Sequence, residues 1–225
     1  MNAEVQSPVQ PKISLMLVAN HEGLRNECRR HFARANTMQI VAEAGSGEEA
    51  CEKFPTYQPQ VVVTDIDLPG MGGLASIRRI VTKNHHAKIA VFSRFKSLVF
   101  VVRALDAGAM GFTYQSSGFA LLDAAIAQLA RGERFLEPEI ARQLALRSWN
   151  WRQEECLSSL ESLTAREFEV FVLLARGATL AETADKLYLG YNTVANRSRS
   201  IRHKLRLASN GEIGAFAQRC RLFSD

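Results

Sequence analysis

One aspartate in this chain stands where a carboxylate could do chemistry. Asp65 directly follows the apolar run at residues 61–64, and Pro69-Gly70 forces a turn shortly after it. The carboxylate is therefore expected at the carboxyl end of a strand, and ligands bind at that edge of an open α/β sheet. The alternative is that Asp65 only caps the loop after the strand. The local sequence leaves both interpretations open.

A second distinctive stretch carries positive charge near the C-terminus. Between positions 186 and 206 there is no Asp or Glu, and six basic residues are present: Lys186, Arg197, Arg199, Arg202, Lys204 and Arg206. Charge of one sign is typical of a surface that meets phosphates. A helix face that only meets solvent would more often mix both signs. The pattern therefore favours nucleic acid as a partner.

The composition is that of a globular protein with two small domains. The chain has 225 residues, of which 47% are hydrophobic, and a net charge of +5. No apolar run approaches the roughly 20 residues that span a bilayer, and the N-terminus lacks the apolar segment of a signal peptide. We therefore expect a cytoplasmic protein with a disordered tail at residues 1–12. Its four scattered cysteines are expected to be free thiols: Cys28, Cys51, Cys156 and Cys220.

The first half of the chain alternates between strand and helix patterns. Strands are predicted at residues 13–18, 40–44, 61–64, 87–92 and 110–114. Helices are predicted at residues 21–35, 47–54, 74–82, 97–107 and 118–130. Apolar strands that alternate with helices in this way require a parallel sheet covered on both faces, so an α/β fold is expected.

The pattern becomes wholly helical toward the C-terminus. Residues 136–160 are expected to be a linker with its own helix, anchored by Trp149 and Trp151; a tryptophan-lined ligand site is the alternative. Residues 161–225 are predicted to form four helices, the first capped by Thr164 and Glu167. The third of these helices carries the basic block. In a helix-turn-helix arrangement of this kind, the second helix enters the major groove of DNA.

Residues 13–135 resemble a response-regulator receiver domain, a doubly wound parallel five-stranded sheet of the flavodoxin-like type. The resemblance rests on Asp65-x-x-Leu68-Pro69-Gly70, on Ser93 after the fourth strand, and on Ala107-Gly108-Ala109-x-Gly111-Phe112. It implies that Asp65 is a phosphoacceptor served by a histidine kinase. It also implies a divalent cation, because the attacking carboxylate and the phosphoryl oxygens are both negative.

Two charged positions of the receiver family are changed in this chain. Ala19-Asn20 stands where the family has an acid pair that holds Mg²⁺, and Gln115 stands in place of a lysine. Since a buried lysine without its acids carries a desolvation cost, the joint loss is physically consistent. We expect weak or absent Mg²⁺ binding and phosphoryl transfer. Asp65 and the amide oxygen of Asn20 remain as oxygen ligands, and Asp67 or Glu22 are candidate substitutes for the lost acids. The expected pocket comprises Ala19, Asn20, Asp65, Asp67, Ser93, Phe112 and Gln115.

The predicted helix at residues 97–107 is apolar nearly all round. Arg103 is the only charge between positions 98 and 105, and the remaining side chains cannot all face one core at a period of 3.6. The receiver resemblance implies dimerisation through this region. We therefore expect an exposed dimer or partner patch, with burial by neighbouring loops as the alternative. The patch residues are Leu98, Val99, Phe100 and Val102.

Residues 161–225 resemble the LuxR-type helix-turn-helix of NarL/FixJ response regulators. The resemblance rests on Leu163-Thr164-x-Arg166-Glu167, Ala181-x-x-Ala184-x-x-Leu187, Thr193-Val194 and Ile201-x-x-Lys204-Leu205. It implies double-stranded DNA as a partner. The implied base contacts come from Ala195, Asn196 and Arg199, and the implied phosphate contacts from Thr193, Arg197, Arg202 and Lys204. Departures at Gly190, Ala195 and Arg197 leave the preferred DNA sequence open.

Together these patterns predict a DNA-binding transcription regulator, expected as a homodimer, whose receiver acts without phosphorylation. One alternative is a conventional response regulator phosphorylated on Asp65. Another is a protein-interaction regulator whose helix-turn-helix no longer reads DNA. An enzyme is not expected, because the sequence has no Ser-His-Asp or Cys-His arrangement and no glycine-rich phosphate loop.

Overall fold

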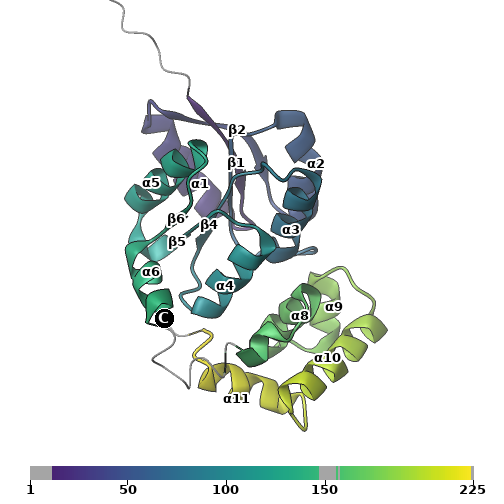
Figure 1. The fold of residues 1–225 in the computed structure, drawn as a ribbon. Helices are drawn as coiled ribbons and strands as arrows, with labels where there is room; N and C mark the ends of the chain where they lie inside the picture. The colour runs from purple at the N-terminus through teal and green to yellow at the C-terminus, as the bar shows by residue number, and fades with distance from the viewer. Residues whose placement is uncertain (1–11, 147–155, 157, 224–225) are drawn as a thin grey trace, which may run out of the picture.

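The computed structural model describes residues 12–146, 156 and 158–223. Nearly all of the predicted N-terminal tail, and both Trp149 and Trp151, lie outside these residues. Figure 1 shows an α/β part and, below it, a smaller part made of helices alone. None of the helices in the described ranges combines the length and apolar character of a membrane span.

A parallel six-stranded sheet forms the centre of the first part. Its strand order is β2-β1-β3-β4-β5-β6. The five predicted strands are confirmed, and the sixth was not predicted because two residues are too short to show an apolar pattern. The strands are β1 (Ile13–Val18), β2 (Met38–Ala44), β3 (Val61–Thr64), β4 (Ile89–Ser93), β5 (Gly111–Tyr114) and β6 (Phe135–Leu136).

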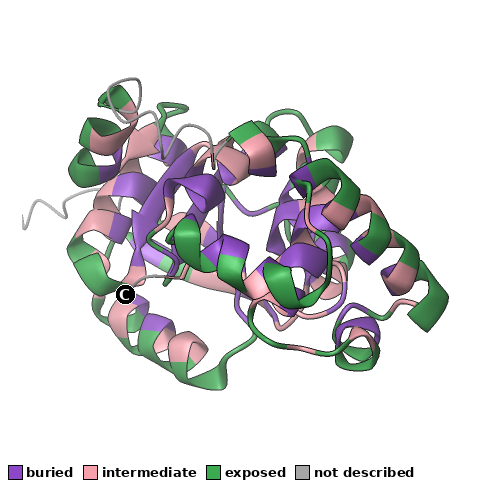
Figure 2. Cartoon of the chain, turned by 90° about the horizontal axis from the view of Figure 1, so that it is seen from below, coloured by how far each residue is buried: buried purple, intermediate pink, exposed green. Residues whose placement is uncertain are grey.

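Helices cover both faces of this sheet (Figure 1). One face is covered by α1 (Glu22–Arg34) and α5 (Phe119–Ala130). The other is covered by α2 (Gly47–Tyr57), α3 (Gly73–Lys83) and α4 (Leu98–Ala107). In Figure 2 the strands are buried between these layers, as expected for a doubly wound fold. This sheet brings the carboxyl ends of β1, β3 and β4 to one edge.

The C-terminal part has the four predicted helices. They are α8 (Ala165–Ala175), α9 (Leu180–Lys186), α10 (Tyr191–Leu205) and α11 (Gly211–Arg219), preceded by the linker helix α6 (Pro138–Ala145). The predicted capping box at α8 is present, with Thr164 and Glu167 each bonding the other's backbone N–H. Thr179 and Glu182 form a second box at α9. The apolar faces of α8, α10 and α11 meet in one core around Phe171, Ile201 and Ile213.

The exposed patch expected on α4 is not present. Leu98, Val99 and Phe100 are buried, and Val102 is half-buried. The excess apolar surface is covered in part by the chain's own C-terminal domain, because the ring of Phe168 in α8 packs edge-on against Phe100 at 5.5 Å between centroids. The expectation was wrong because the covering residues lie far away in sequence.

The expectation of four free thiols is wrong for one pair. Cys156 and Cys220 form a disulfide, with their Cα atoms 5.5 Å apart. Their separation of 64 residues hid the pairing, which arises because the chain entering α8 packs beside the end of α11. Cys28 and Cys51 are free, as predicted for them, and both are buried.

Candidate functional site

Asp65 lies at the end of β3, on a strand flanked by β1 and β4. Its side chain is buried, with 3% of the residue exposed. The carboxylate oxygen Oδ1 accepts a hydrogen bond from the backbone N–H of Ile66 at 2.6 Å and a longer one from that of Asp67 at 3.4 Å. The turn after the strand therefore folds over the carboxylate, and Asp65 is both an interior acid and a loop cap.

Two of the predicted pocket residues, Gln115 and Ser93, lie beside this carboxylate. Gln115 places its amide Nε2 at 3.4 Å from Asp65 Oδ2, and the same nitrogen donates to the carbonyl oxygen of Phe92 at 3.0 Å. Ser93 is fully buried at the end of β4, and Phe112 is fully buried in β5. The Gln115 amide thus stands at the site of the family's lysine but brings no positive charge.

The surroundings of Asp65 make its carboxyl harder to ionise than that of an exposed aspartate. Burial raises the pKa of the Asp65 carboxyl, and the negative charge of Asp67 raises it further. The N–H of Ile66 and the hydroxyl of Ser93 act in the opposite direction. A carboxyl group that resists ionisation is a poorer nucleophile toward a phosphoryl group, which is itself negative.

The residues near Asp65 do not fit a magnesium ion. Ala19 has no side-chain oxygen, and the backbone carbonyl oxygens of Ala19 and Asn20 accept hydrogen bonds from Arg25, at 2.5 and 2.9 Å. Glu22 pairs with Arg25 and Arg29, so it does not turn toward the pocket as a substitute ligand. Mg²⁺ demands several oxygen ligands in an octahedral array, and Asp65 supplies the one buried acid here.

The other candidate ligand, Asp67, is occupied by arginines. It pairs with Arg94 of the receiver and with Arg176, the residue that follows α8, whose Nη1 lies 3.3 Å from Asp67 Oδ2. Two guanidinium groups at one carboxylate offset the charge that would attract a divalent cation. Asp67 therefore serves a contact between the two domains.

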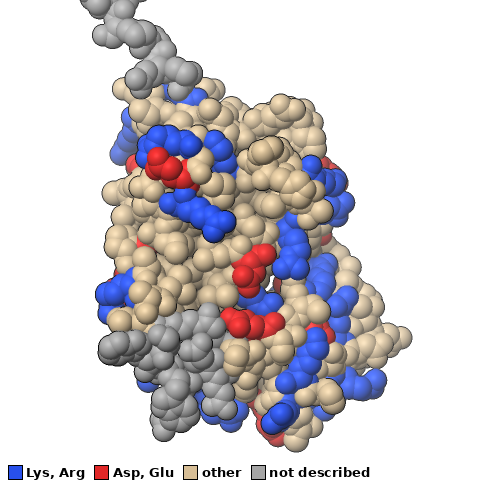
Figure 3. Space-filling view, viewed as in Figure 1, with Lys and Arg blue, Asp and Glu red and all other residues tan. Residues whose placement is uncertain are grey.

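The predicted DNA-reading helix presents a polar face to solvent. Val194, Ser198, Ile201 and Leu205 are buried against the domain core. Thr193, Asn196 and Arg199 are exposed on the other side, and Arg199 Nη1 lies 3.5 Å from Asn196 Oδ1. Figure 3 shows Lys and Arg side chains gathered over the C-terminal domain. The predicted base-contacting pair Asn196 and Arg199 is thus brought together and left accessible.

The other residues predicted to contact DNA are partly buried or already bonded within the protein. Ala195, Arg197 and Arg202 are half-buried, and Arg202 donates to the carbonyl oxygen of Ala208 at 3.1 Å. Lys204 Nζ lies 2.7 Å from the carboxylate of Glu167, whose side chain is 8% exposed. Although burial raises the pKa of Glu167, hydrogen bonds from Lys204, Ser200 and Thr164 together lower it to about 2. Lys204 therefore stabilises the domain as well as contributing positive charge.

Polar contacts join the loop after Asp65 to the helix-turn-helix. The backbone N–H of Gly70 donates to the carbonyl oxygen of Lys186, the last residue of α9, at 2.7 Å. Arg166 of α8 donates to the carbonyl oxygens of Gly70 and Met71, both at 2.9 Å. These bonds connect a receiver loop to the two helices that precede the DNA-reading helix. Sequence analysis did not predict them.

Aromatic rings extend this contact beside α4. Phe95 stacks on Phe100 at 4.3 Å between centroids, and Phe223 near the C-terminus lies 6.3 Å from Phe95. The guanidinium of Arg176 lies over both Phe95 and Phe223, at 4.7 and 5.3 Å. Such cation–π contacts add to the burial of the rings. The apolar core is therefore continuous from the receiver into the C-terminal domain.

Glu169 is the least expected residue at this boundary. Its side chain is 9% exposed, and Arg166 Nη1 contacts one of its oxygens at 2.5 Å. The other oxygen, Oε1, has no hydrogen-bond partner in the described part of the chain and lies where a side chain on Gly72 would stand. Burial raises the pKa of Glu169 to about 7, although Arg166 opposes the rise. A cavity of about 340 Å³ beside it is lined by residues of both domains, including Asp67, Arg94 and Phe168.

Comparisons with known proteins match both parts. Residues 15–127 match the family model described as response regulator receiver domain. Residues 161–217 match the model described as bacterial regulatory proteins, luxR family. The matched ranges contain every residue predicted above for the pocket and for DNA contact.

Curated relatives share nearly the whole length of the chain. The response regulator GacA of Pseudomonas aeruginosa is 30% identical over 207 residues, which cover 92% of this chain and 96% of the relative. The transcriptional activator protein ExaE of Pseudomonas putida is 32% identical over 201 residues, covering 89% and 94%. The response regulator UvrY of Escherichia coli K12 is 28% identical over 207 residues, covering 92% and 94%.

A solved structure has the same fold over both domains. RcsB of Salmonella enterica serovar Typhimurium, bound to promoter DNA in the presence of the phosphomimetic BeF3−, superposes with a TM-score of 0.67 at 20% identity. The match covers 92% of this chain and 99% of that one. The chain therefore belongs to the non-enzymatic two-component response regulators of the NarL/FixJ type, in which a receiver domain precedes a LuxR-type DNA-binding domain.

Proposed function

We propose that this response regulator controls transcription without phosphorylation of Asp65. The observation that carries the proposal is that an uncharged amide, and not a cation, contacts the Asp65 carboxylate. The Gln115 amide takes the place of a cation, Ala19 offers no ligand, and Arg25 binds the neighbouring carbonyl oxygens. Phosphoryl transfer to a carboxylate needs positive charge to offset the oxygens of both groups. The guanidinium groups nearest Asp65, those of Arg25, Arg94 and Arg176, are paired with other oxygens.

The proposed output is sequence-specific binding to double-stranded DNA by a cytoplasmic homodimer. Asn196 and Arg199 would read base edges next to Ala195, because Asn pairs bidentately with adenine and Arg with guanine. Phosphate contacts would come from Thr193, Arg197, Arg202 and Lys204, which fix the position of the helix. The exposure of Thr193, Asn196 and Arg199 supports this assignment. The proposal divides the chain into residues 13–135, 136–160 and 161–225.

The test is incubation with Mg²⁺ and acetyl phosphate, followed by intact-mass measurement. We expect the wild type to remain unmodified. The variant Ala19→Asp/Asn20→Asp/Gln115→Lys, which restores the family's charges, should gain a phosphoryl group that Asp65→Asn removes. Stoichiometric modification of the wild type, abolished by Asp65→Asn, would instead establish a conventional regulator with a histidine kinase partner.

A salt-dependent titration on duplex DNA separates DNA binding from a purely protein-directed role. When a protein binds DNA phosphates it releases counterions, so the logarithm of the binding constant falls linearly with the logarithm of the salt concentration. We expect this slope for the wild type. Absence of binding at low salt would favour the protein-interaction regulator.

A further inference from the structure

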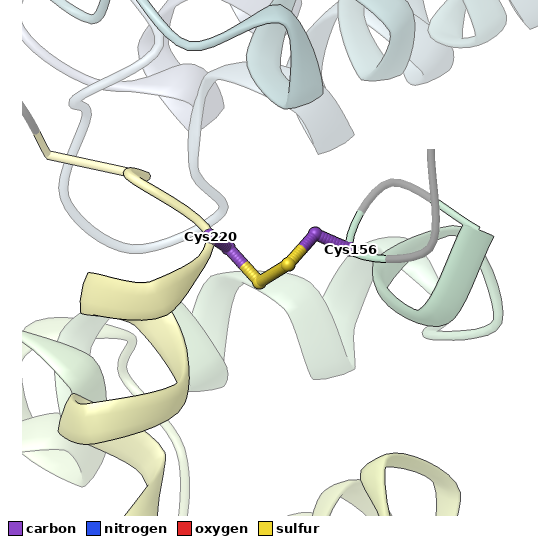
Figure 4. Close-up of a disulfide and its surroundings, with 2 residues drawn as sticks. All are labelled: Cys156 and Cys220. Carbon is purple, nitrogen blue, oxygen red and sulfur yellow. A yellow bond between two sulfur atoms is a disulfide. The ribbon is translucent and has the colours of Figure 1, made fainter. Parts of the chain in front are cut away.

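The disulfide joins two segments that both contact the receiver domain. Cys156 lies on the chain that enters the C-terminal domain, and Cys220 ends α11 (Figure 4). The sulfur atoms therefore link the first and last parts of that domain. Each cysteine is followed within four residues by a contact to α4 or to the loop that precedes it.

On the Cys156 side the contact is made by Leu160. This residue is fully buried, and its carbonyl oxygen accepts a hydrogen bond from Arg103 of α4. The Arg103 guanidinium also lies 4.9 Å from the ring centroid of Phe168. The segment after Cys156 is thus held on the face of α4 that carries Arg103.

On the Cys220 side the contact is made by Phe223. Its ring lies 6.3 Å from Phe95 and 6.4 Å from Phe100, between centroids, and Arg176 covers it. Leu222, next to it, is buried at 1% exposure. The last described residues of the chain therefore pack at the same domain boundary as Leu160.

We propose that Cys156 and Cys220 form a reversible thiol–disulfide exchange site for small-molecule disulfides such as oxidised glutathione. When oxidised, the pair fastens both segments and thereby holds the C-terminal domain on α4. When reduced, each segment can leave α4 independently. The protein's redox state thus biases the balance between the docked and released C-terminal domain.

The exchange needs no other reactant. Cys156 is the more accessible of the two and reacts first: its thiolate attacks one sulfur of the small disulfide and displaces one small thiolate. The Cys220 thiolate then attacks the Cys156 sulfur of this mixed disulfide and displaces the second. The protein loses two electrons, the small disulfide gains them, and the two thiol protons end on the two released small thiols.

The two remaining cysteines act as internal controls. Cys28 is fully buried, and burial raises the pKa of its thiol to about 12. Burial also raises the pKa of the Cys51 thiol. Because the thiolate is the reactive form, neither residue is suited to exchange. Modification is therefore expected to be confined to Cys156 and Cys220.

The full-length protein is equilibrated with graded ratios of reduced and oxidised glutathione, then alkylated and analysed by mass spectrometry. We expect one intramolecular bond whose fraction follows the glutathione ratio. Hydrogen exchange of the α4 amides should be at least about fivefold slower in the oxidised protein. In Cys156→Ser and Cys220→Ser the α4 amides should show, at every glutathione ratio, the hydrogen-exchange rate of the reduced wild type. Cys51→Ala should behave as the wild type.

Four outcomes would overturn the proposal. The bond could persist at every ratio, which would make it a permanent structural link. The two thiols could fail to pair, or they could pair between two molecules. Finally, the α4 amides could exchange at the same rate in the oxidised and reduced proteins. Using the reduced wild type beside both serine variants separates loss of the bond from damage caused by a substitution.

Discussion

Asp67 and Arg176 form an ion pair across the domain boundary, with Arg176 Nη1 3.3 Å from Asp67 Oδ2. Asp67 lies two residues after Asp65, on the loop that also hydrogen-bonds to α8 and α9 through Gly70. The loop that follows the phosphoacceptor position therefore docks the DNA-binding domain. The loop is therefore in direct contact with α8 and α9, the helices that precede α10.

Replacing Arg176 with Ala should loosen this contact. The variant loses a partly exposed ion pair, worth up to about 1 kcal/mol, and the cation–π contacts with Phe95 and Phe223, worth about 0.5–1 kcal/mol. We expect faster hydrogen exchange in α8 and the Asp67 loop. Arg142→Ala removes an exposed pair within α6 and is the control. Equal exchange in both variants would show that Arg176 does not hold the domains.

A methyl group at Gly72 should separate the domains more directly. Gly72 has a φ of +76°, and an added Cβ would lie 2.3 Å from Glu169 Oε1. Gly118 has a similar φ of +81° but no neighbour within 4 Å of its Cβ position. Both alanine variants carry backbone strain of about 1–3 kcal/mol, because φ is positive and ψ extended at both positions. Only Gly72→Ala should also raise the exchange of α8 amides, and the prediction fails if Gly118→Ala raises it equally.

The sequence was informative where local periodicity decides structure. The alternating apolar runs placed Asp65, Ser93 and Gln115 at one sheet edge, and the buried spacing of Val194 and Ile201 oriented α10 correctly. These features depend on residues close together in the chain.

Features that depend on distant partners were not predictable in this way. Phe168 and Phe223 cover α4 from the other domain, and Cys220 finds Cys156 across 64 residues. The role of Asp67 was also missed, because its partner Arg176 is 109 residues away. The excess of apolar residues on α4 indicated that other residues must bury this helix, but it did not identify them.

Stability should depend on pH through Glu169. Burial raises its pKa from 4.5 to about 7 in the folded protein, so folding favours the protonated form. The stabilisation is complete below about pH 4.5 and is lost as pH rises through 7, at a cost of up to about 3 kcal/mol. Denaturant titrations at several pH values should show that the free energy of unfolding falls more steeply with rising pH in the wild type than in Glu169→Gln. Parallel pH profiles for the two proteins would contradict the assignment, and exposed Glu133→Gln is the control.

Arg199 and Lys204 should differ in their effects on DNA binding. Arg199 is exposed beside Asn196, so Arg199→Ala should relax specificity at one base pair by about 1–3 kcal/mol without loss of stability. Lys204→Ala should weaken binding to all sequences alike, flatten the salt dependence, and destabilise the domain because Glu167 loses its partner. Binding measured on a selected duplex and on its single-base variants checks both. Unchanged binding in both variants would mean that the DNA-reading face is assigned wrongly.

The most direct test of phosphorylation-independent control is the dissociation constant for a selected DNA duplex. It is measured for the wild type and Asp65→Asn, each with and without Mg²⁺ and acetyl phosphate. Because the Gln115 amide, and not a cation, contacts the Asp65 carboxylate, we predict that all four values agree within about twofold, a difference below roughly 0.5 kcal/mol. A tightening of about tenfold in the wild type with acetyl phosphate, absent from Asp65→Asn, would contradict the account.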